Sequence, residues 1–332
     1  MTTASSGLLG VTDPDLQARV GEGLEQVEAR LREVVRSSHP LLSEAAAHLV
    51  SAGGKRFRPL LTLLAAQFGD ATRPQVVDAA VVVELTHLAT LYHDDVMDEA
   101  PVRRGAESAN TRWSNTVAIL TGDYLFARAS DLTAGLGTEA TRLQSRTFAR
   151  LVEGQIAETA GPAAGADAVA HHLKVLADKT ASLISTSARL GAMTAGAAPD
   201  VVDTLAAYGE VIGIAFQLSD DLIDVLSEAG QSGKTPGTDL REGVPTLPTL
   251  IALRSTDAGS ERLRALLSRP LTDDAEHAEA LTLLRAHPAL DEARAQLEAC
   301  VDDARRIAGT LPPGAATDAL LALCDYVLAR TG

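Results

Sequence analysis

Cysteines and aromatic residues are scarce in this chain, and each scarcity excludes a class of protein. The 332 residues include two cysteines, Cys300 and Cys324, with no further cysteine to build a disulfide framework or a zinc-binding spacing. Aromatic residues make up 3% of the chain, whereas hydrophobic residues make up 46%. This balance, rich in Ala, Leu and Val, favours close-packed helices over β-sandwiches or barrels. We therefore expect an all-α protein in a reducing compartment.

An excess of positive charge and long apolar runs are also lacking. The formal net charge of −15 argues against a general nucleic-acid binder and against docking on anionic lipid. No run of 18 apolar residues occurs, so no membrane span is expected, and residues 1–11 lack the basic and apolar regions of a secretory signal. These features predict a soluble cytoplasmic protein.

Helical periodicity dominates the chain, and no convincing alternating strand pattern occurs. Because apolar helices closely flank the Gly/Pro-rich segment at 161–165, we interpret that segment as a loop rather than a domain linker. The pattern predicts a flexible N-terminus (1–12) followed by one all-α domain (13–330). The helices expected in the middle of the chain are 107–134, 140–158, 168–196 and 200–228, and smaller helices are expected at 247–267, 273–286, 289–309 and 315–330.

Two aspartate clusters share one DDxxD spacing: Asp94-Asp95-Val96-Met97-Asp98 and Asp220-Asp221-Leu222-Ile223-Asp224. In each cluster the first and last carboxylates lie four residues apart, on one helical face. Each cluster also lies where its helix is expected to end, so its charge opposes the helix dipole and destabilises the helix. A divalent cation would offset this repulsion, and paired carboxylates with few other ligands are typical of Mg²⁺.

Basic residues accompany the acidic clusters. The segment Gly53-Gly54-Lys55-Arg56-Phe57-Arg58-Pro59 places three cations at an expected helix start, which is a good phosphate-binding position. Arg103 and Arg104 follow the first cluster, and two adjacent arginines can bind two separate phosphates. His87 lies on nearly the same helical face as Asp94, two turns before it. The combination indicates Mg²⁺-bridged diphosphates.

Taken together, these motifs resemble the trans-isoprenyl diphosphate (polyprenyl) synthase family over roughly residues 50–255. The matching segments are, in order, GGKRFRP, ELTHLATLYHDDVMDEAPVRRG, TGDYL, DKTASL, FQLSDDLID and GKTPGTDLREGVPTLP. The resemblance implies an all-α barrel of antiparallel helices around a central cavity, usually a homodimer, with the two aspartate motifs facing each other across its mouth.

The resemblance also implies ligands for three Mg²⁺ ions. Asp94 and Asp98 would hold two of the ions and Asp220 the third. Asp95, Asp221 and Asp224 would support the site or bind metal through water.

The same resemblance implies the substrates and the residues that bind them. The allylic diphosphate would be held by the metals and by Arg103, Lys179, Thr180, Gln217 and Lys234. Isopentenyl diphosphate would be held without metal by Lys55, Arg58, His87 and Arg104. The implied reaction is ionisation of the allylic diphosphate, attack by the isopentenyl double bond and loss of a proton, with the metals and cations stabilising the departing pyrophosphate. The residues that would carry catalysis are Asp94, Asp98, Arg103, Lys179, Asp220 and Lys234.

Residues before the first aspartate motif bear on product length. Thr86, Ala89 and Thr90 lie along one flank of the Asp94 face and could line a tunnel for the growing chain. None of them is the Phe or Tyr plug by which short-chain relatives stop elongation. We therefore expect a long product, heptaprenyl to nonaprenyl, of the kind that serves as a quinone side chain. Phe126 is a candidate for the tunnel floor.

Three alternatives remain open. A shorter-chain geranylgeranyl diphosphate synthase would share every motif above. A class I terpene cyclase shares the fold, but its second motif normally follows an Asn/Ser/Glu pattern, and it would have no use for Lys55, Arg58 and Arg104. A subunit of a heteromeric synthase would fit if the purified chain needed a second protein for turnover.

Overall fold

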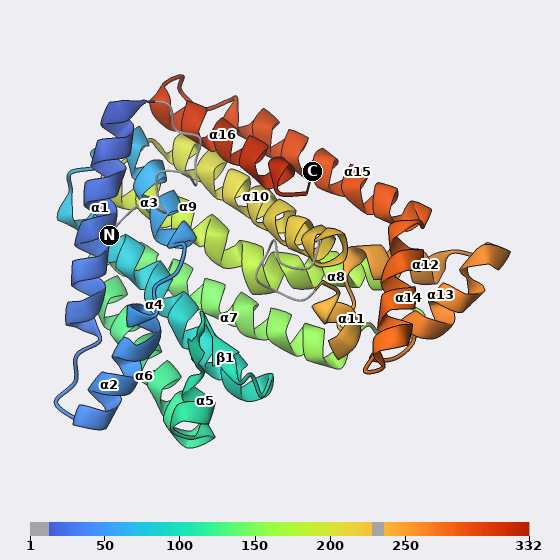
Figure 1. Cartoon of the computed structure of the whole chain (residues 1–332). Helices are drawn as coiled ribbons and strands as arrows, with labels where there is room; N and C mark the ends of the chain where they lie inside the picture. The colour runs from blue at the N-terminus through green and yellow to red at the C-terminus, as the bar shows by residue number, and fades with distance from the viewer. Residues whose placement is uncertain (1–12, 228–235, 332) are drawn as a thin grey trace. The chain divides into compact units, whose positions relative to one another are not determined.

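Helices account for nearly all of the regular structure. The structure, a computed structural model, describes residues 13–227 and 236–331, and within them the one exception to helix is a two-stranded hairpin (Figure 1). The prediction of an all-α protein is therefore confirmed.

The helices follow one another in chain order, joined by short connections. Their bounds are α1 (Pro14–Val34), α2 (Pro40–Ser51), α3 (Phe57–Ala65), α4 (Pro74–Met97), α5 (Ala109–Arg112), α6 (Asn115–Leu136), α7 (Thr138–Ala160), α8 (Ala168–Leu176), α9 (Ser182–Ala195), α10 (Pro199–Leu226), α11 (Thr238–Glu242), α12 (Leu247–Arg254), α13 (Glu261–Leu267), α14 (Asp274–Arg285), α15 (Pro288–Ala308) and α16 (Ala315–Ala329). Short 3₁₀ or π segments are η1 (Ala66–Phe68), η2 (Ala177–Ala181) and η3 (Ala258–Ser260).

The chain divides into two compact units. Unit 1 comprises Met1–Ala149, Leu183–Gly209 and Ala308–Ala322, and unit 2 comprises Arg150–Ser182, Glu210–Ile307 and Leu323–Gly332. The first aspartate motif belongs to unit 1 and the second to unit 2. The prediction of a single domain stays a prediction.

The core of unit 1 is built around α4, which packs against α1, α3 and α6 (Figure 1). Apolar side chains of α4 from Val81 to Val83, with Leu85 and Leu88, are fully buried. In unit 2, α12 packs against α8 and α13, and α13 against α14. Both aspartate motifs thus lie on long helices, α4 and α10, each anchored by its apolar residues.

Side-chain caps explain where several helices begin. Asp13 accepts a hydrogen bond from the Leu16 amide at 2.7 Å, and Pro14 occupies the first turn of α1. Asp167 accepts hydrogen bonds from the amides of Val169 and Ala170 at the start of α8. These are the start signals that the sequence shows.

The helix expected at 107–134 is wrong at its N-terminal end. Strands β1 (Val102–Arg103) and β2 (Ala106–Glu107) form an antiparallel hairpin instead, followed by the short α5 and then by α6. Arg104 and Gly105 form the two-residue turn with φ of 54° and 74°, the positive-φ pair of a type I′ turn. The extended backbone of Ser114 (φ −179°) separates α5 from α6, and its Oγ caps α6. Two other expected helices, 168–196 and 247–267, are interrupted by η2 and by residues 255–260 respectively.

Helices α4 and α10 are each long and apolar enough, by length and composition, to cross a membrane. In α4, however, 67% of the apolar window is buried inside the protein, and in α10 the share is 50%. The buried core helix of a globular protein can be as apolar as a membrane-spanning helix. Helices α4 and α10 are therefore weak evidence for a membrane protein.

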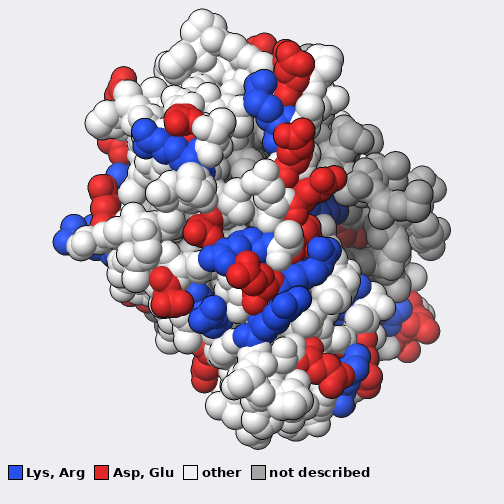
Figure 2. All heavy atoms as spheres, turned by 90° about the vertical axis from the view of Figure 1, so that its left-hand side faces the viewer, with Lys and Arg blue, Asp and Glu red and all other residues white. Residues whose placement is uncertain are grey.

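Figure 2 shows a face on which positive and negative side chains lie next to one another rather than in separate patches. Ion pairs of this kind in unit 1 include Arg30 with Glu33 at 2.8 Å and with Asp78 at 3.0 Å. On this face the two signs of charge therefore offset one another locally.

Candidate active site

The first aspartate motif ends α4, and its three carboxylates differ in exposure. Asp95 is fully buried, Asp94 is half-buried, and the Asp98 side chain is 57% exposed. Arg103, on β1, donates from Nε to Asp95 Oδ1 at 2.6 Å and places Nη2 3.6 Å from Asp98 Oδ2. Asp95 Oδ2 is buried without a hydrogen-bond partner. The middle aspartate therefore anchors the motif, and an arginine neutralises charge at the helix C-terminus.

A cluster of arginines lies in unit 1 around one buried carboxylate, that of Glu84. Arg56 donates from Nη1 to Glu84 Oε1 at 2.7 Å, and Arg104 Nη2 lies 3.5 Å from the same oxygen. Arg56 also pairs with Glu28. Arg58 contributes a third guanidinium, and its Nε is buried without a hydrogen-bond partner. The cluster has more cations than nearby carboxylates and a donor left over, which suits an anion.

The backbone around this cluster takes conformations that most residues avoid. Gly53 and Gly54 have φ of 82° and 144°, and Arg56 and Arg104 adopt the left-handed region with φ of 49° and 54°. Such conformations in non-glycine residues persist where surrounding contacts hold them, and they occur often at functional sites. Here they turn the arginines inward, where Arg104 donates to the carbonyl oxygens of Leu49, at 3.3 Å, and of Gly53.

The electrostatics of the cluster also favour an anion. Burial lowers the pKa of Arg58 to about 10, with Glu84 raising it and Arg104 lowering it. Burial, with Arg58 and Arg104 nearby, holds the pKa of His87 well below its usual range, so His87 is neutral at pH 7. The negative charge of a bound diphosphate would offset the positive charge of these neighbouring arginines. Lys55, the remaining basic residue predicted here, is exposed.

The second aspartate motif, in unit 2, is held by a different set of partners. Arg330 pairs with Asp220, and its guanidinium lies 4.3 Å from the ring centroid of Phe216. Asp221 is buried and accepts from the Leu247 amide at 3.0 Å, while Nε2 of His172 lies 2.9 Å from its Oδ2.

The last carboxylate of this motif lies beside α11. Asp224 accepts from the amides of Thr238 and Asp239, at 3.0 and 3.3 Å, at the start of that helix. The three carboxylates of the second motif therefore have three different environments. The Asp220 side chain is 41% exposed, compared with 9% for that of Asp221.

Two of the other predicted diphosphate ligands in unit 2 belong to η2, the π-helical segment between α8 and α9. These are Lys179 and Thr180, both half-buried, and Lys179 pairs with Glu158 of α7. Gln217, on α10 one turn before the second motif, is also half-buried. Lys234 lies outside the described residues.

The three residues expected to line the product tunnel lie on α4 with unequal exposure. Thr86 and Ala89 are fully buried, and Thr90 is half-buried. The Thr86 hydroxyl donates to the Val82 carbonyl at 2.8 Å and accepts from Gln144 of α7 at 2.6 Å. Their role in product length stays a prediction.

Phe126, the candidate for the tunnel floor, is half-buried on α6. Its ring lies 4.3 Å, centroid to centroid, from that of Phe148 and 5.7 Å from that of His93. Its role in closing a tunnel also stays a prediction.

Sequence reasoning missed several residues that contact the predicted ones. Arg56 was visible in the GGKRFRP segment, but its inward direction depends on its positive φ. Arg330 and His172 carried no sequence signal, because each lies far along the chain from the aspartate it contacts. The missed residues that contact predicted ones are Glu84, Glu158, His172 and Arg330. Glu28, Arg56 and Arg150 contact residues that lie beside the predicted ones.

The aspartates fit a hard divalent cation. Every predicted ligand is a carboxylate, and arginines lie against Asp95, Asp98 and Asp220 where positive charge is required. Within residues 13–227 and 236–331, no group of three or more His, Cys, Asp or Glu side chains forms a ready-made cage. Mg²⁺ does not need one, since it is commonly bound by one or two carboxylates together with waters and substrate phosphates.

An all-α protein with two aspartate-rich helix ends and a buried arginine cluster is of the kind that binds diphosphates with metal ions. Residues 39–284 match the polyprenyl synthetase family, and the chain belongs to that family. Members of the family are prenyltransferases, so the chain is a transferase.

Individual relatives span almost the whole chain. It is 49% identical over 335 residues to a nonaprenyl diphosphate synthase of Mycobacterium tuberculosis, covering 100% of both chains. It is 37% identical to heptaprenyl diphosphate synthase component 2 of Geobacillus stearothermophilus, covering 93% of this chain and 96% of the relative. Among solved structures, it resembles a geranylgeranyl pyrophosphate synthase of Corynebacterium glutamicum complexed with calcium and isoprenyl diphosphate, with a TM-score of 0.89, 44% identity and coverage of 98% of this chain and 100% of the other.

Proposed function

We propose that the chain condenses isopentenyl diphosphate head-to-tail with an allylic diphosphate, releasing pyrophosphate and extending the product to a long all-trans polyprenyl diphosphate. The observation that carries this proposal is the arginine cluster of unit 1, with its unpartnered Arg58 Nε, in a chain that also has two aspartate motifs. An enzyme that joins two diphosphates needs two anion sites, and a cluster without aspartates supplies one that does not depend on metal.

Arg58, His87 and Arg104, with Lys55 at the surface, hold the isopentenyl diphosphate. The guanidinium groups present forked donors to its phosphate oxygens, and neutral His87 donates one further hydrogen bond. Glu84 holds Arg104 in place and is itself paired with Arg56. The double bond of the substrate is thereby fixed for attack, which lowers the entropic part of the barrier.

The allylic diphosphate is held by Arg103, Lys179, Thr180, Gln217 and Lys234 together with Mg²⁺ bound by the aspartates. When bound, Mg²⁺ neutralises the charge that develops on the departing pyrophosphate. Asp94, Asp98 and Asp220 would hold the metal, and Asp95, Asp221 and Asp224 would orient them or bind it through water. Arg103 and Arg330 balance the acidic motifs in the absence of metal, because each lies against an aspartate. The released pyrophosphate is the base that accepts the proton.

The product is heptaprenyl to nonaprenyl, serving as a quinone side chain. Small residues at positions 86, 89 and 90 support a long product, as does the similarity to a nonaprenyl diphosphate synthase. The similarity to a geranylgeranyl pyrophosphate synthase makes the shorter product the second candidate.

The active form is a homodimer in the cytoplasm. Exposed apolar side chains of α7 recur every fourth residue: Phe148, Val152 and Ile156 are 36%, 43% and 62% exposed. On α6, Ile119 and Leu120 are 43% and 58% exposed. Apolar faces of this kind on a monomer mark protein interfaces, and a second copy of the chain is the simplest partner.

One assay tests the proposed function. The purified chain is incubated with farnesyl diphosphate and magnesium, with and without labelled isopentenyl diphosphate, and the dephosphorylated products are analysed by mass. We expect long polyprenols only when both substrates are present. A hydrocarbon formed without isopentenyl diphosphate would identify a cyclase instead, and turnover that appears only after another protein is added would identify a heteromeric subunit.

A further inference from the structure

The segment that carries Lys179 and Thr180 is a π helix inserted between two α helices. In η2 the Ser182 amide donates to the Ala177 carbonyl, a bond to the fifth preceding residue rather than the fourth. One extra residue per turn rotates the following side chains by about 100° relative to a continuous α helix. The π insertion therefore decides which way Lys179 and Thr180 point. π insertions need support, because they leave backbone groups poorly bonded.

Helix α7 supports this segment with three residues spaced one turn apart, Arg150, Gly154 and Glu158. Because residues at i and i+4 share a helical face, all three lie on the face toward η2. Arg150 and Glu158 contact Asp178 and Lys179 respectively. A Cβ added at Gly154 would lie 2.6 Å from the Lys179 amide nitrogen. The helix thus approaches the π segment so closely that only glycine fits between the two charged residues.

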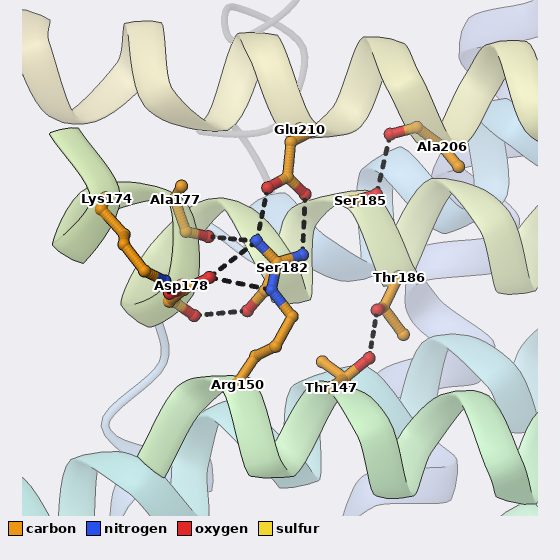
Figure 3. Close-up of polar contacts among 10 residues, drawn as sticks. All are labelled: Thr147, Arg150, Lys174, Ala177, Asp178, Ser182, Ser185, Thr186, Ala206 and Glu210. Carbon is orange, nitrogen blue, oxygen red and sulfur yellow. Dashed lines mark hydrogen bonds and ion pairs between the residues drawn. The ribbon is translucent and has the colours of Figure 1, made fainter. Parts of the chain in front are cut away.

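Arg150 is the centre of the polar contacts around η2 (Figure 3). Its Nε donates to Asp178 Oδ1 at 2.9 Å, and its Nη2 donates to the Ala177 carbonyl at 3.3 Å. Both Nη atoms donate to the Glu210 carboxylate of α10, at 2.6 and 3.2 Å. One guanidinium therefore joins α7, the π segment and α10 within unit 2.

The contacts of Arg150 coincide with the backbone groups that the π insertion disturbs. The Ala177 carbonyl accepts both the π-helical bond and the Arg150 donor, and the Asp178 carbonyl accepts the Ser182 hydroxyl at 2.6 Å. The hydrogen bond with Glu210 raises the pKa of Arg150. Burial raises the pKa of Asp178, but hydrogen bonds from Lys174 and Arg150 more than offset it and lower the pKa overall. Asp178 is thus charged near neutral pH and remains paired.

Lys174 also pairs with Asp178 but is a weaker restraint. Its side chain is 72% exposed, compared with 39% for Arg150, and an exposed lysine holds one geometry poorly. Asp178 itself is nearly buried, with 10% of its side chain exposed.

We propose that Arg150 is a positioning residue that fixes the π segment in the register that presents Lys179 and Thr180 to a diphosphate. This inference rests on the proposed function, because it assumes that Lys179 binds the allylic substrate. Arg150 itself touches no substrate. Its effect on the diphosphate passes through Asp178 and the backbone of η2.

A double-mutant cycle tests this role by binding rather than turnover. The Kd for farnesyl diphosphate is measured with magnesium and without isopentenyl diphosphate, in Arg150→Met, Lys179→Ala and the double variant. We expect Arg150→Met to raise the Kd by about ten- to a hundredfold, as misplacing one ligand does. In the Lys179→Ala background the same change should raise the Kd several-fold less, because only the contact of Thr180 is then left to misplace. Equal effects in both backgrounds would overturn the proposal.

Two further variants separate positioning from loss of folding. Arg150→Lys can pair with one carboxylate but not bridge both, so it should restore part of the affinity. Gly154→Ala should weaken binding without removing any charge, whereas Gly21→Ala in α1, where nothing lies within 4 Å of the added Cβ, should not. If Gly154→Ala bound farnesyl diphosphate with full affinity, the close approach of α7 to η2 would not be what positions Lys179.

Hydrogen exchange keeps this inference independent of the proposed function. The amides of residues 177–182 should exchange at least about tenfold faster in Arg150→Met, and not in Arg262→Met, which removes an exposed pair with Glu279. If the chain fails to condense the two diphosphates, the proposed function fails. Unchanged exchange at 177–182 would instead overturn the role of Arg150.

Discussion

Arg103 Nε lies 2.6 Å from Asp95 Oδ1, so the middle carboxylate of the first aspartate motif is already paired inside the protein. Asp95 is fully buried, whereas the arginine is 27% exposed and also lies near Asp98. This pair connects the end of α4 to the hairpin that follows it. The three aspartates of one motif therefore serve different purposes, and substitutions should separate them.

Asp95→Asn should destabilise the protein more than it impairs catalysis. The change leaves Arg103 without its charged partner next to a buried amide, which costs about 2 kcal/mol in the free energy of unfolding. Asp94→Asn should destabilise the protein less than Asp95→Asn, because Asp94 is half-buried rather than fully buried, and should lower kcat about a hundredfold or more, because it removes a metal ligand. Urea denaturation and steady-state kinetics on both variants measure the contrast. Similar losses of stability in the two would contradict it.

Arg58→Met should weaken the binding of isopentenyl diphosphate selectively. The variant removes the guanidinium whose Nε is buried without a partner, so the KM for this substrate should rise about ten- to a hundredfold. The KM for the allylic diphosphate should stay within about twofold. Arg112→Met is the matched control, since Arg112 forms an exposed pair with Glu44 in the same unit. A rise in the allylic KM alone would assign Arg58 to the other substrate.

His87 should make the protein less stable in mild acid. Burial and the nearby Arg58 and Arg104 lower its pKa in the folded chain, whereas the unfolded chain takes up a proton near pH 6.5. Because the unfolded state then binds more protons, the free energy of unfolding falls as pH drops below about 6.5, by up to about 1.4 kcal/mol per pH unit. Between pH 7.5 and 5.5, His87→Asn should lose less stability than the wild type. Parallel urea curves at both pH values test this, and equal losses would show that His87 does not titrate as described.

Ala89→Phe should shorten the products. A phenyl group there would fill the space flanking the first aspartate motif, so chains should end closer to geranylgeranyl. Ala89 is fully buried, so the variant should also lose about 1–3 kcal/mol of stability through overpacking. Thr90→Phe, at a half-buried site, should shorten products with less loss of stability. An unchanged product distribution in both, measured by mass spectrometry, would contradict the tunnel assignment.

Removing divalent metal should abolish turnover while leaving the fold intact. Arg103 and Arg330 lie against Asp95 and Asp220, so the acidic helix ends are partly neutralised without metal. After treatment with EDTA, Tm should therefore change by only a few degrees, about 4 °C or less, and added magnesium should restore activity. Continued turnover in EDTA would show that the aspartates do not act through a metal.

Some local structure was readable in the sequence and some was not. The end of α4 at the aspartate motif was expected from the sequence, and its start at Pro74 places a proline in the first helical turn, where proline is favoured. The hairpin at 102–107 was missed, although Arg104-Gly105 fits a two-residue turn with positive φ. The π segment was not readable, because it depends on contacts from α7 and α10 rather than on the residues within it.

The sequence by itself determined the all-α class, the two DDxxD motifs and the basic residues that accompany them, because helical periodicity and motif spacing are local properties of a chain. Tertiary structure decided which of those residues are buried anchors and which are exposed. Asp95 and Asp221 are anchored by Arg103 and His172, and Arg58 keeps an unpartnered donor. These differences depend on contacts that the motif spacing does not specify: the hairpin turns Arg103 back onto Asp95, and folding brings His172, 49 residues away, to Asp221.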